Sequence, residues 1–167
     1  MTLPLIYSFA RPLDVSLVFE DRTYNLGETI DITVQLNTRS DIKVRKGRIY
    51  LMYDVRWTEA ETELQPLGGR LGRGGLRGMA YYTDRVPTGK QLEKSQSYVL
   101  GGVEFLRSSH LEPAGINTYS IGLKIHNDDP PYSYVQRASM AWSLVAEVDV
   151  IRALDANTCK DLKVFVR

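Results

Sequence analysis

Residues 111–150, LEPAGINTYSIGLKIHNDDPPYSYVQRASMAWSLVAEVDV, decide the fold class. They contain a turn, an alternating segment at 117–126, a proline-containing link and most of a second alternating segment at 137–152. In both segments every second residue is apolar, which is the period of a strand with one buried and one solvated face. Pro130 and Pro131 cannot donate to a strand ladder and therefore separate the two segments. This stretch predicts two strands of an all-β protein.

The same alternation recurs towards the N-terminus. Residues 13–20 predict a short strand, and residues 28–37 predict the most regular strand of the chain. Residues 41–57 predict a long central strand, antiparallel to the one before it, with a kink at the Arg-Lys-Gly sequence of 45–47. Further strands are expected within 81–86 and 90–107, and a short one at 162–166. Because no amphipathic helix of useful length is present, we predict an immunoglobulin-like antiparallel β-sandwich.

Composition limits the domain count and the kind of partner. With 167 residues, 43% of them hydrophobic, we expect a single domain over residues 1–167. It would carry an N-terminal arm (1–11) and a Gly/Arg-rich loop (66–78). The 21 Lys and Arg nearly balance the 20 Asp and Glu, so no nucleic-acid partner is expected. The lone cysteine, Cys159, excludes an intrachain disulfide, and no apolar run is long enough for a membrane helix. We therefore expect a cytoplasmic protein without an integral membrane segment.

Four segments, taken in order, resemble the N-terminal β-sandwich domain of the arrestin family. Residues 18–38, VFEDRTYNLGETIDITVQLNT, resemble its opening strand, its Tyr-x-x-Gly-Glu turn and the alternating strand that follows. Residues 41–54 resemble the long strand after it, and residues 111–125 a Pro-x-Gly turn leading into a strand. Residues 130–150 resemble a Pro-Ser-aromatic link before a strand of the form x-Tyr-x-Val-x-Ala-x-Val, with Trp142 in the aromatic position.

The resemblance implies an arrestin-type β-sandwich that acts as a non-enzymatic scaffold or adaptor with a protein partner. Fold analogy supports function only by association. The Gly/Arg-rich loop has no counterpart in the family pattern, and we expect no second sandwich domain. Because phosphate sensing in arrestins needs charges from both domains, the resemblance assigns no phosphate-binding residues here.

The candidate partner-binding residues lie in two loops. Arg70, Arg73 and Arg77 stand among six glycines, and their guanidinium groups could bind carboxylate or phosphate through paired hydrogen bonds. The alternative is a solvated loop without a partner. Tyr132 and Tyr134, beside the two prolines, are candidate recognition aromatics. Association of two copies through open sheet edges is a further alternative.

Catalytic and metal sites are not assigned, and no cofactor is expected. The two histidines, His110 and His126, lie in different segments, and no Gly-x-Ser-x-Gly sequence is present. The sequence His-Asn-Asp-Asp at 126–129 offers oxygen ligands for a weak calcium site, but such residues beside prolines are ordinary turn formers. The alternative function is a sandwich that binds carbohydrate or an anionic small molecule, which needs surface aromatics on one sheet face or a pocket between the sheets.

Overall fold

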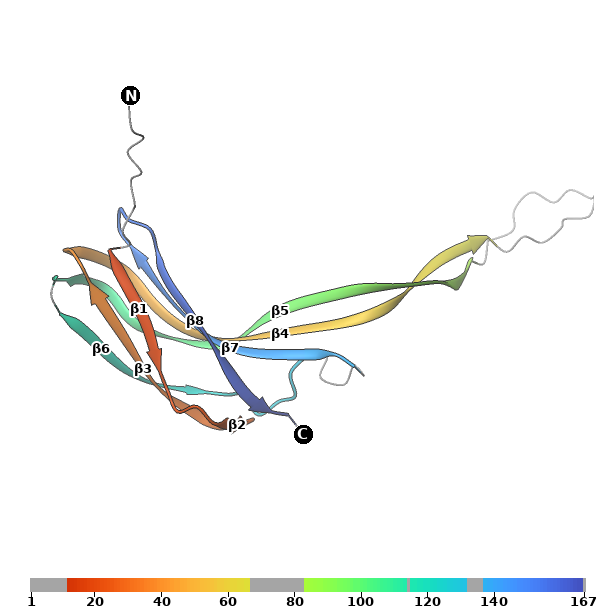
Figure 1. The fold of residues 1–167 in the computed structure, drawn as a ribbon, viewed down its shortest axis with the longest axis horizontal. Helices are drawn as coiled ribbons and strands as arrows, with labels where there is room; N and C mark the ends of the chain where they lie inside the picture. The colour runs from red at the N-terminus through yellow and green to blue at the C-terminus, as the bar shows by residue number, and fades with distance from the viewer. Residues whose placement is uncertain (1–11, 67–82, 114, 132–136, 167) are drawn as a thin grey trace, which may run out of the picture.

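The computed structural model describes residues 12–66, 83–113, 115–131 and 137–166, and these form eight strands in two sheets (Figure 1). One sheet has the order β1-β3-β6, and the other has the order β2-β8-β7-β4-β5. All neighbouring strands are antiparallel except β2 and β8. The predicted all-β sandwich is therefore confirmed. The strands are β1 (Leu13–Val18), β2 (Thr23–Asn25), β3 (Thr29–Thr38), β4 (Ile42–Pro66), β5 (Thr83–Leu111), β6 (Ile116–Lys124), β7 (Ser139–Val150) and β8 (Ala156–Phe165).

The core lies between the two sheets and follows the predicted alternation. In β3 the even-numbered residues 30–36 are buried, as are the odd-numbered residues 49–55 of β4. The even-numbered residues 142–150 of β7 are also buried, Trp142 among them. β-Branched and aromatic side chains suit such a pleated, buried surface. Alternation over these strands therefore identifies the inward face of each one.

The prediction that the strand after residue 41 pairs with the preceding strand is wrong. β3 pairs with β1 and β6, whereas β4 lies in the other sheet, between β7 and β5. Both sheets turn an apolar face towards the same core, so alternation cannot tell which sheet a strand joins. The kink itself is confirmed as an irregularity. Arg45 is an extra residue opposite β7, and the register with β5 shifts between Gly47 and Arg48.

β5 is one strand of 29 residues rather than the two or three that the sequence predicts. The residues that resemble strand breaks are bulges in a continuous ladder. Leu100 and Gly101 together stand opposite Leu51, and Gly101 has a φ of +117°, which favours glycine. Within β5, Val103 is 36% exposed, whereas Tyr98, Leu100 and Phe105 are partly buried against the core.

Beyond the sandwich, β4 and β5 continue as a two-stranded ribbon (Figure 1). The ladder between β4 and β7 ends at the pair Arg56–Ser139. From Trp57–Lys94 to Pro66–Thr83, β4 continues to pair with β5. We call residues 57–66 and 83–94 the ribbon. It projects from the end of the five-stranded sheet and is the most elongated feature of the molecule.

Candidate functional site

The five residues predicted to bind a partner lie outside the described residues. Arg70, Arg73 and Arg77 belong to the segment that joins β4 to β5, and Tyr132 and Tyr134 to the link before β7. Because Pro66 pairs with Thr83, the joining segment starts and finishes at the far end of the ribbon. The assignment of these residues stays a prediction.

The two histidines lie in different segments of the chain and have different neighbours. His110 is exposed near the end of β5, with its Nε2 3.8 Å from Oδ1 of Asp41. His126 follows β6 and lies beside the bulge at Gly101, where a Cβ would come within 3.2 Å of its Nε2. Neither makes a hydrogen bond to a serine within the described part of the chain. The described residues also contain no group of three or more His, Cys, Asp or Glu placed to hold a metal.

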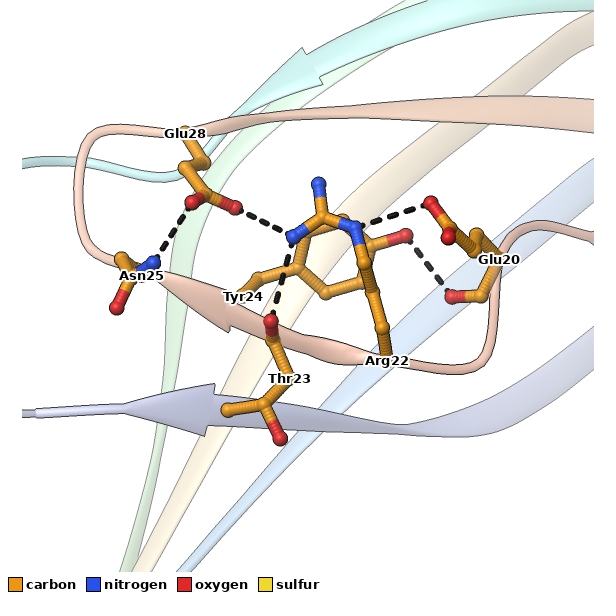
Figure 2. A network of polar contacts seen from close by, with 6 residues as sticks. All are labelled: Glu20, Arg22, Thr23, Tyr24, Asn25 and Glu28. Atoms are coloured by element: carbon orange, nitrogen blue, oxygen red, sulfur yellow. Dashed lines mark hydrogen bonds and ion pairs between the residues drawn. The ribbon is translucent and has the colours of Figure 1, made fainter.

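The Tyr-x-x-Gly-Glu turn contains a dense polar network (Figure 2). The Glu28 carboxylate accepts hydrogen bonds from Asn25 Nδ2 at 2.7 Å and from the Arg22 guanidinium at 2.8 Å. These bonds from Asn25 and Arg22 lower the pKa of Glu28. Arg22 also bonds the Glu20 carboxylate at 3.0 Å and lies 4.0 Å from the centre of the Tyr24 ring. Tyr24 in turn donates its hydroxyl to the Glu20 carbonyl at 2.9 Å.

Backbone hydrogen bonds attach this turn to the residue that follows β6 in the three-stranded sheet. The Gly27 N–H donates to the Ile125 carbonyl at 3.1 Å, and the Ile125 N–H donates to the Glu28 carbonyl at 2.8 Å. Gly27 has a φ of +85°, a backbone conformation that residues other than glycine rarely adopt. Since the polar groups of the turn bond to one another, they stabilise the fold and leave little capacity for a ligand.

A second polar cluster covers the outer face of the five-stranded sheet. The Tyr50 hydroxyl donates to Glu147 at 2.7 Å, and Arg48 bonds the same carboxylate at 3.2 Å. Burial, followed by the hydrogen bond to Glu147, raises the pKa of Tyr50 to about 12. Nearby, Lys46 and Glu104 form an ion pair at 3.1 Å. The charges of this face are therefore largely neutralised by one another.

At the base of the ribbon, in contrast, three cations make no ion pair with the residues that the structure describes. A hollow of about 620 Å³ lies where β7 begins beside β4, and we call it the shoulder. Three exposed cations line it, namely Arg56, Lys94 and Arg137, and none of them makes an ion pair with another described residue. The remaining lining residues are Asp54, Val55, Trp57, Thr58, Glu93, Ser95, Gln96, Ser97 and Ser139.

No motif in the sequence indicates the shoulder. Its cations come from β4, from β5 and from the residues before β7, segments that are far apart in the chain. Each cation read singly is an ordinary polar residue on a strand or in a turn. The strand pairing Arg56–Ser139 and Arg56–Ser95 is what brings the three segments together, and this pairing is not encoded in any local motif.

The described chain, all β and with two facing sheets, has the fold of an arrestin-type β-sandwich. The crystal structure of Spo0M, a sporulation control protein from Bacillus subtilis, is similar, with a TM-score of 0.61 at 13% sequence identity. The match covers 93% of this chain and 50% of the Spo0M chain, so this chain spans about half the length of Spo0M. At this identity the similarity shows the fold alone. No family model and no curated protein matches the sequence. No helix among the described residues is long and apolar enough to cross a membrane.

Proposed function

We propose that this protein is a non-enzymatic protein-interaction scaffold and that the ribbon is the element that contacts its partner. The observation that supports this proposal is the extension of β4 and β5 beyond the sandwich (Figure 1). Residues 58–60 and 89–97 are exposed, so this part of the two strands adds little to the core. A two-stranded ribbon is only marginally stable by itself in water, so contact with another molecule would stabilise it.

The ribbon also offers the groups that protein partners use. Within the described structure, β5 is the edge strand of its sheet and pairs with β4 alone. A free strand edge presents unpaired N–H and C=O groups to which an extended peptide can add. This is a physical basis for a scaffold that does not depend on the family resemblance.

The proposal also covers the number of domains, the cellular location and the kind of partner. We propose that residues 1–167 form a single domain. We also propose that the protein is located in the cytoplasm, because the free and exposed thiol of Cys159 suits a reducing compartment. The balanced charge favours a protein rather than a nucleic acid as partner. Association of two copies through the β5 edge is the competing outcome.

A variant with a shortened ribbon tests the proposal. Residues 61–90 are replaced by Asn-Gly, a two-residue turn that joins the paired residues Ala60 and Gln91. Both proteins are immobilised and incubated with lysate of the native host, and the bound proteins are identified by mass spectrometry. We expect a specific protein to be recovered with the intact chain and lost with the shortened one. Equal recovery by both variants would refute the role of the ribbon.

A second variant locates the contact within the ribbon. In it Arg70, Arg73 and Arg77 are all replaced by Ala, while both strands are retained. Loss of the partner would assign the contact to the joining segment, and retention would assign it to the strands. Failure of all forms to recover a specific protein, with two copies associating instead, would replace the scaffold proposal by self-association.

A further inference from the structure

We propose that two copies of this chain associate through the outer edge of β6, which pairs with the β6 of the second copy in antiparallel orientation. The three-stranded sheets of the two copies would then join into one continuous sheet, with three strands from each copy. This inference goes beyond the proposed function, because it concerns how the protein assembles and not what its ribbon contacts. It is supported by the regular backbone of β6, by the few protecting features at this edge and by the sequence of the strand.

β6 is an edge strand with a regular backbone. It lies at the margin of the three-stranded sheet, where it pairs with β3 alone among the described strands (Figure 1). The register with β3 runs without a shift from the pair Thr29–Lys124 to the pair Asn37–Ile116. No residue of β6 has a positive φ, and none is proline. The side of β6 that faces away from β3 therefore presents a regular row of backbone groups to which a further strand can pair.

The other edges of the sandwich are less suited to such pairing. Where β5 lies beside the part of β4 that buries the core, the ladder between them shifts register, and Gly101 and Ser108 have positive φ. β1, at the opposite margin of the three-stranded sheet, is only six residues long. Bulges, short strands and charged side chains are the means by which proteins protect exposed strand edges. β6 has none of the bulges, and its single charged residue is Lys124 at its end.

The sequence of β6 fits a second copy of the same strand. A two-fold axis beside Ser120 places this residue opposite its own counterpart and places Thr118 opposite Gly122. The same axis places Lys124 opposite Ile116, so that every residue of β6 is paired. Each pair joins two residues on the same side of the sheet, as an antiparallel ladder requires. Because the exposed residues at the centre are small and uncharged, the two strands can approach without a steric or electrostatic conflict.

The ends of the paired strands are also complementary. Ile116 is 67% exposed in the single chain, and the alkyl stem of Lys124 from the second copy would cover it. Glu112 lies at the same end of the sheet, because its carbonyl accepts a hydrogen bond at 2.6 Å from Thr38, the neighbour of the β3 residue that pairs with Ile116. Neither Lys124 nor Glu112 makes an ion pair with another described residue. This complementarity of charge favours a second copy over an unrelated peptide.

Sedimentation velocity tests this association. We expect the intact protein to convert from monomer to dimer as its concentration rises from about 1 to about 100 µM. Ser120→Lys would place two ammonium groups opposite each other, and Ser120→Glu would place two carboxylates there. Each variant should therefore dimerise at least about tenfold more weakly than the intact chain. A mixture of the two variants should restore dimerisation, because each lysine then faces a glutamate.

Substitutions at the opposite margin of the same sheet provide the matched control. Ser16→Lys and Ser16→Glu introduce the same side chains at an exposed serine of β1 and should leave dimerisation unchanged. Thermal unfolding of all four variants verifies that they remain folded. The inference would be overturned by a protein that stays monomeric at every concentration, by equal weakening from substitutions of Ser16 and Ser120, or by a mixture that does not restore dimerisation.

The outcomes separate this inference from the proposed function. The shortened-ribbon variant retains the whole of β6, so it should dimerise like the intact chain even if it recovers no host protein. Dimerisation that disappears with the ribbon would overturn pairing through β6 in favour of pairing through the ribbon. Conversely, Ser120→Lys retains the ribbon, so recovery of a host protein by this variant tests the scaffold function without the dimer.

Discussion

Two buried tyrosines differ in what their hydroxyl groups contact. The Tyr24 hydroxyl donates to the Glu20 carbonyl at 2.9 Å, whereas the Tyr53 hydroxyl is buried and has no hydrogen-bond partner among the described residues. We expect Tyr24→Phe to lower the free energy of unfolding by about 1 kcal/mol, because it leaves that carbonyl without its donor. Tyr53→Phe should raise the free energy of unfolding or leave it unchanged, because it removes an unsatisfied polar group.

Urea denaturation of the two variants measures this difference. Both substitutions remove a single oxygen atom from a ring in the core, so each serves as the size-matched control for the other. Effects of the same sign and similar size would contradict the assignment of their hydroxyl groups.

The lowered pKa of Glu28 leads to a prediction of how the stability of the fold changes with pH. Its pKa is lowered in the folded protein by hydrogen bonds from Asn25 and Arg22. The stabilisation is therefore present above the pH at which a free glutamate titrates, and it is lost as the pH falls through the lowered value. In Glu28→Gln this contribution is absent, so the difference in melting temperature from the parent should shrink steadily as the solution is acidified.

Calorimetry over the acidic range measures this trend. Glu112→Gln is the control, because the Glu112 side chain is exposed and makes no ion pair among the described residues. A difference for Glu28→Gln that stays constant with pH would show that the carboxylate is not engaged in the turn.

At the scale of the element, the ribbon should be nearly independent of the sandwich. Its described side chains are mainly exposed, so replacing residues 61–90 by Asn-Gly removes little buried apolar surface. We expect the melting temperature to change by less than about 4 °C, which corresponds to roughly 1 kcal/mol for a domain of this size. A loss of cooperative unfolding would show instead that the ribbon supports the core.

The elements also show what a sequence pattern can and cannot predict. The inward faces of β3, β6 and β7 were predictable because their alternation is regular and long. The sheet to which β4 belongs was not predictable, since the same face of β4 would be buried in either sheet. β2, with three residues, is too short to show any period. In β5, Gly101 and Gly89 suggest breaks, yet they occupy positions of positive φ within one strand.

At the scale of the whole molecule, exchange of backbone amides should divide the protein into two classes. Amides of β3 and β7 lie in the interior of their sheets and should open only with global unfolding, which costs roughly 5–15 kcal/mol in typical domains. Those of the ribbon should open locally at far lower cost. Hydrogen exchange measured by mass spectrometry tests this division, and slow exchange throughout the ribbon of the isolated protein would contradict it.

The candidate site, the shoulder, can be recognised only once the pairing of strands in the whole molecule is known. Arg56, Lys94 and Arg137 come together through strand pairing over distances that no motif spans. The residues that the sequence did single out, Arg70, Arg73 and Arg77, stand in the segment joining the two ribbon strands and remain a prediction.

The continuity of β4 has a mechanical consequence. The same strand that buries Leu51, Tyr53 and Val55 in the core continues without interruption into the ribbon. A partner that pulls the far end of the ribbon along its length would load the β4–β7 ladder in shear, so that its hydrogen bonds resist together rather than one after another. Tension on the ribbon would then reach the core directly through β4, and the attachment would resist more force than a hairpin joined to the sandwich by a surface loop.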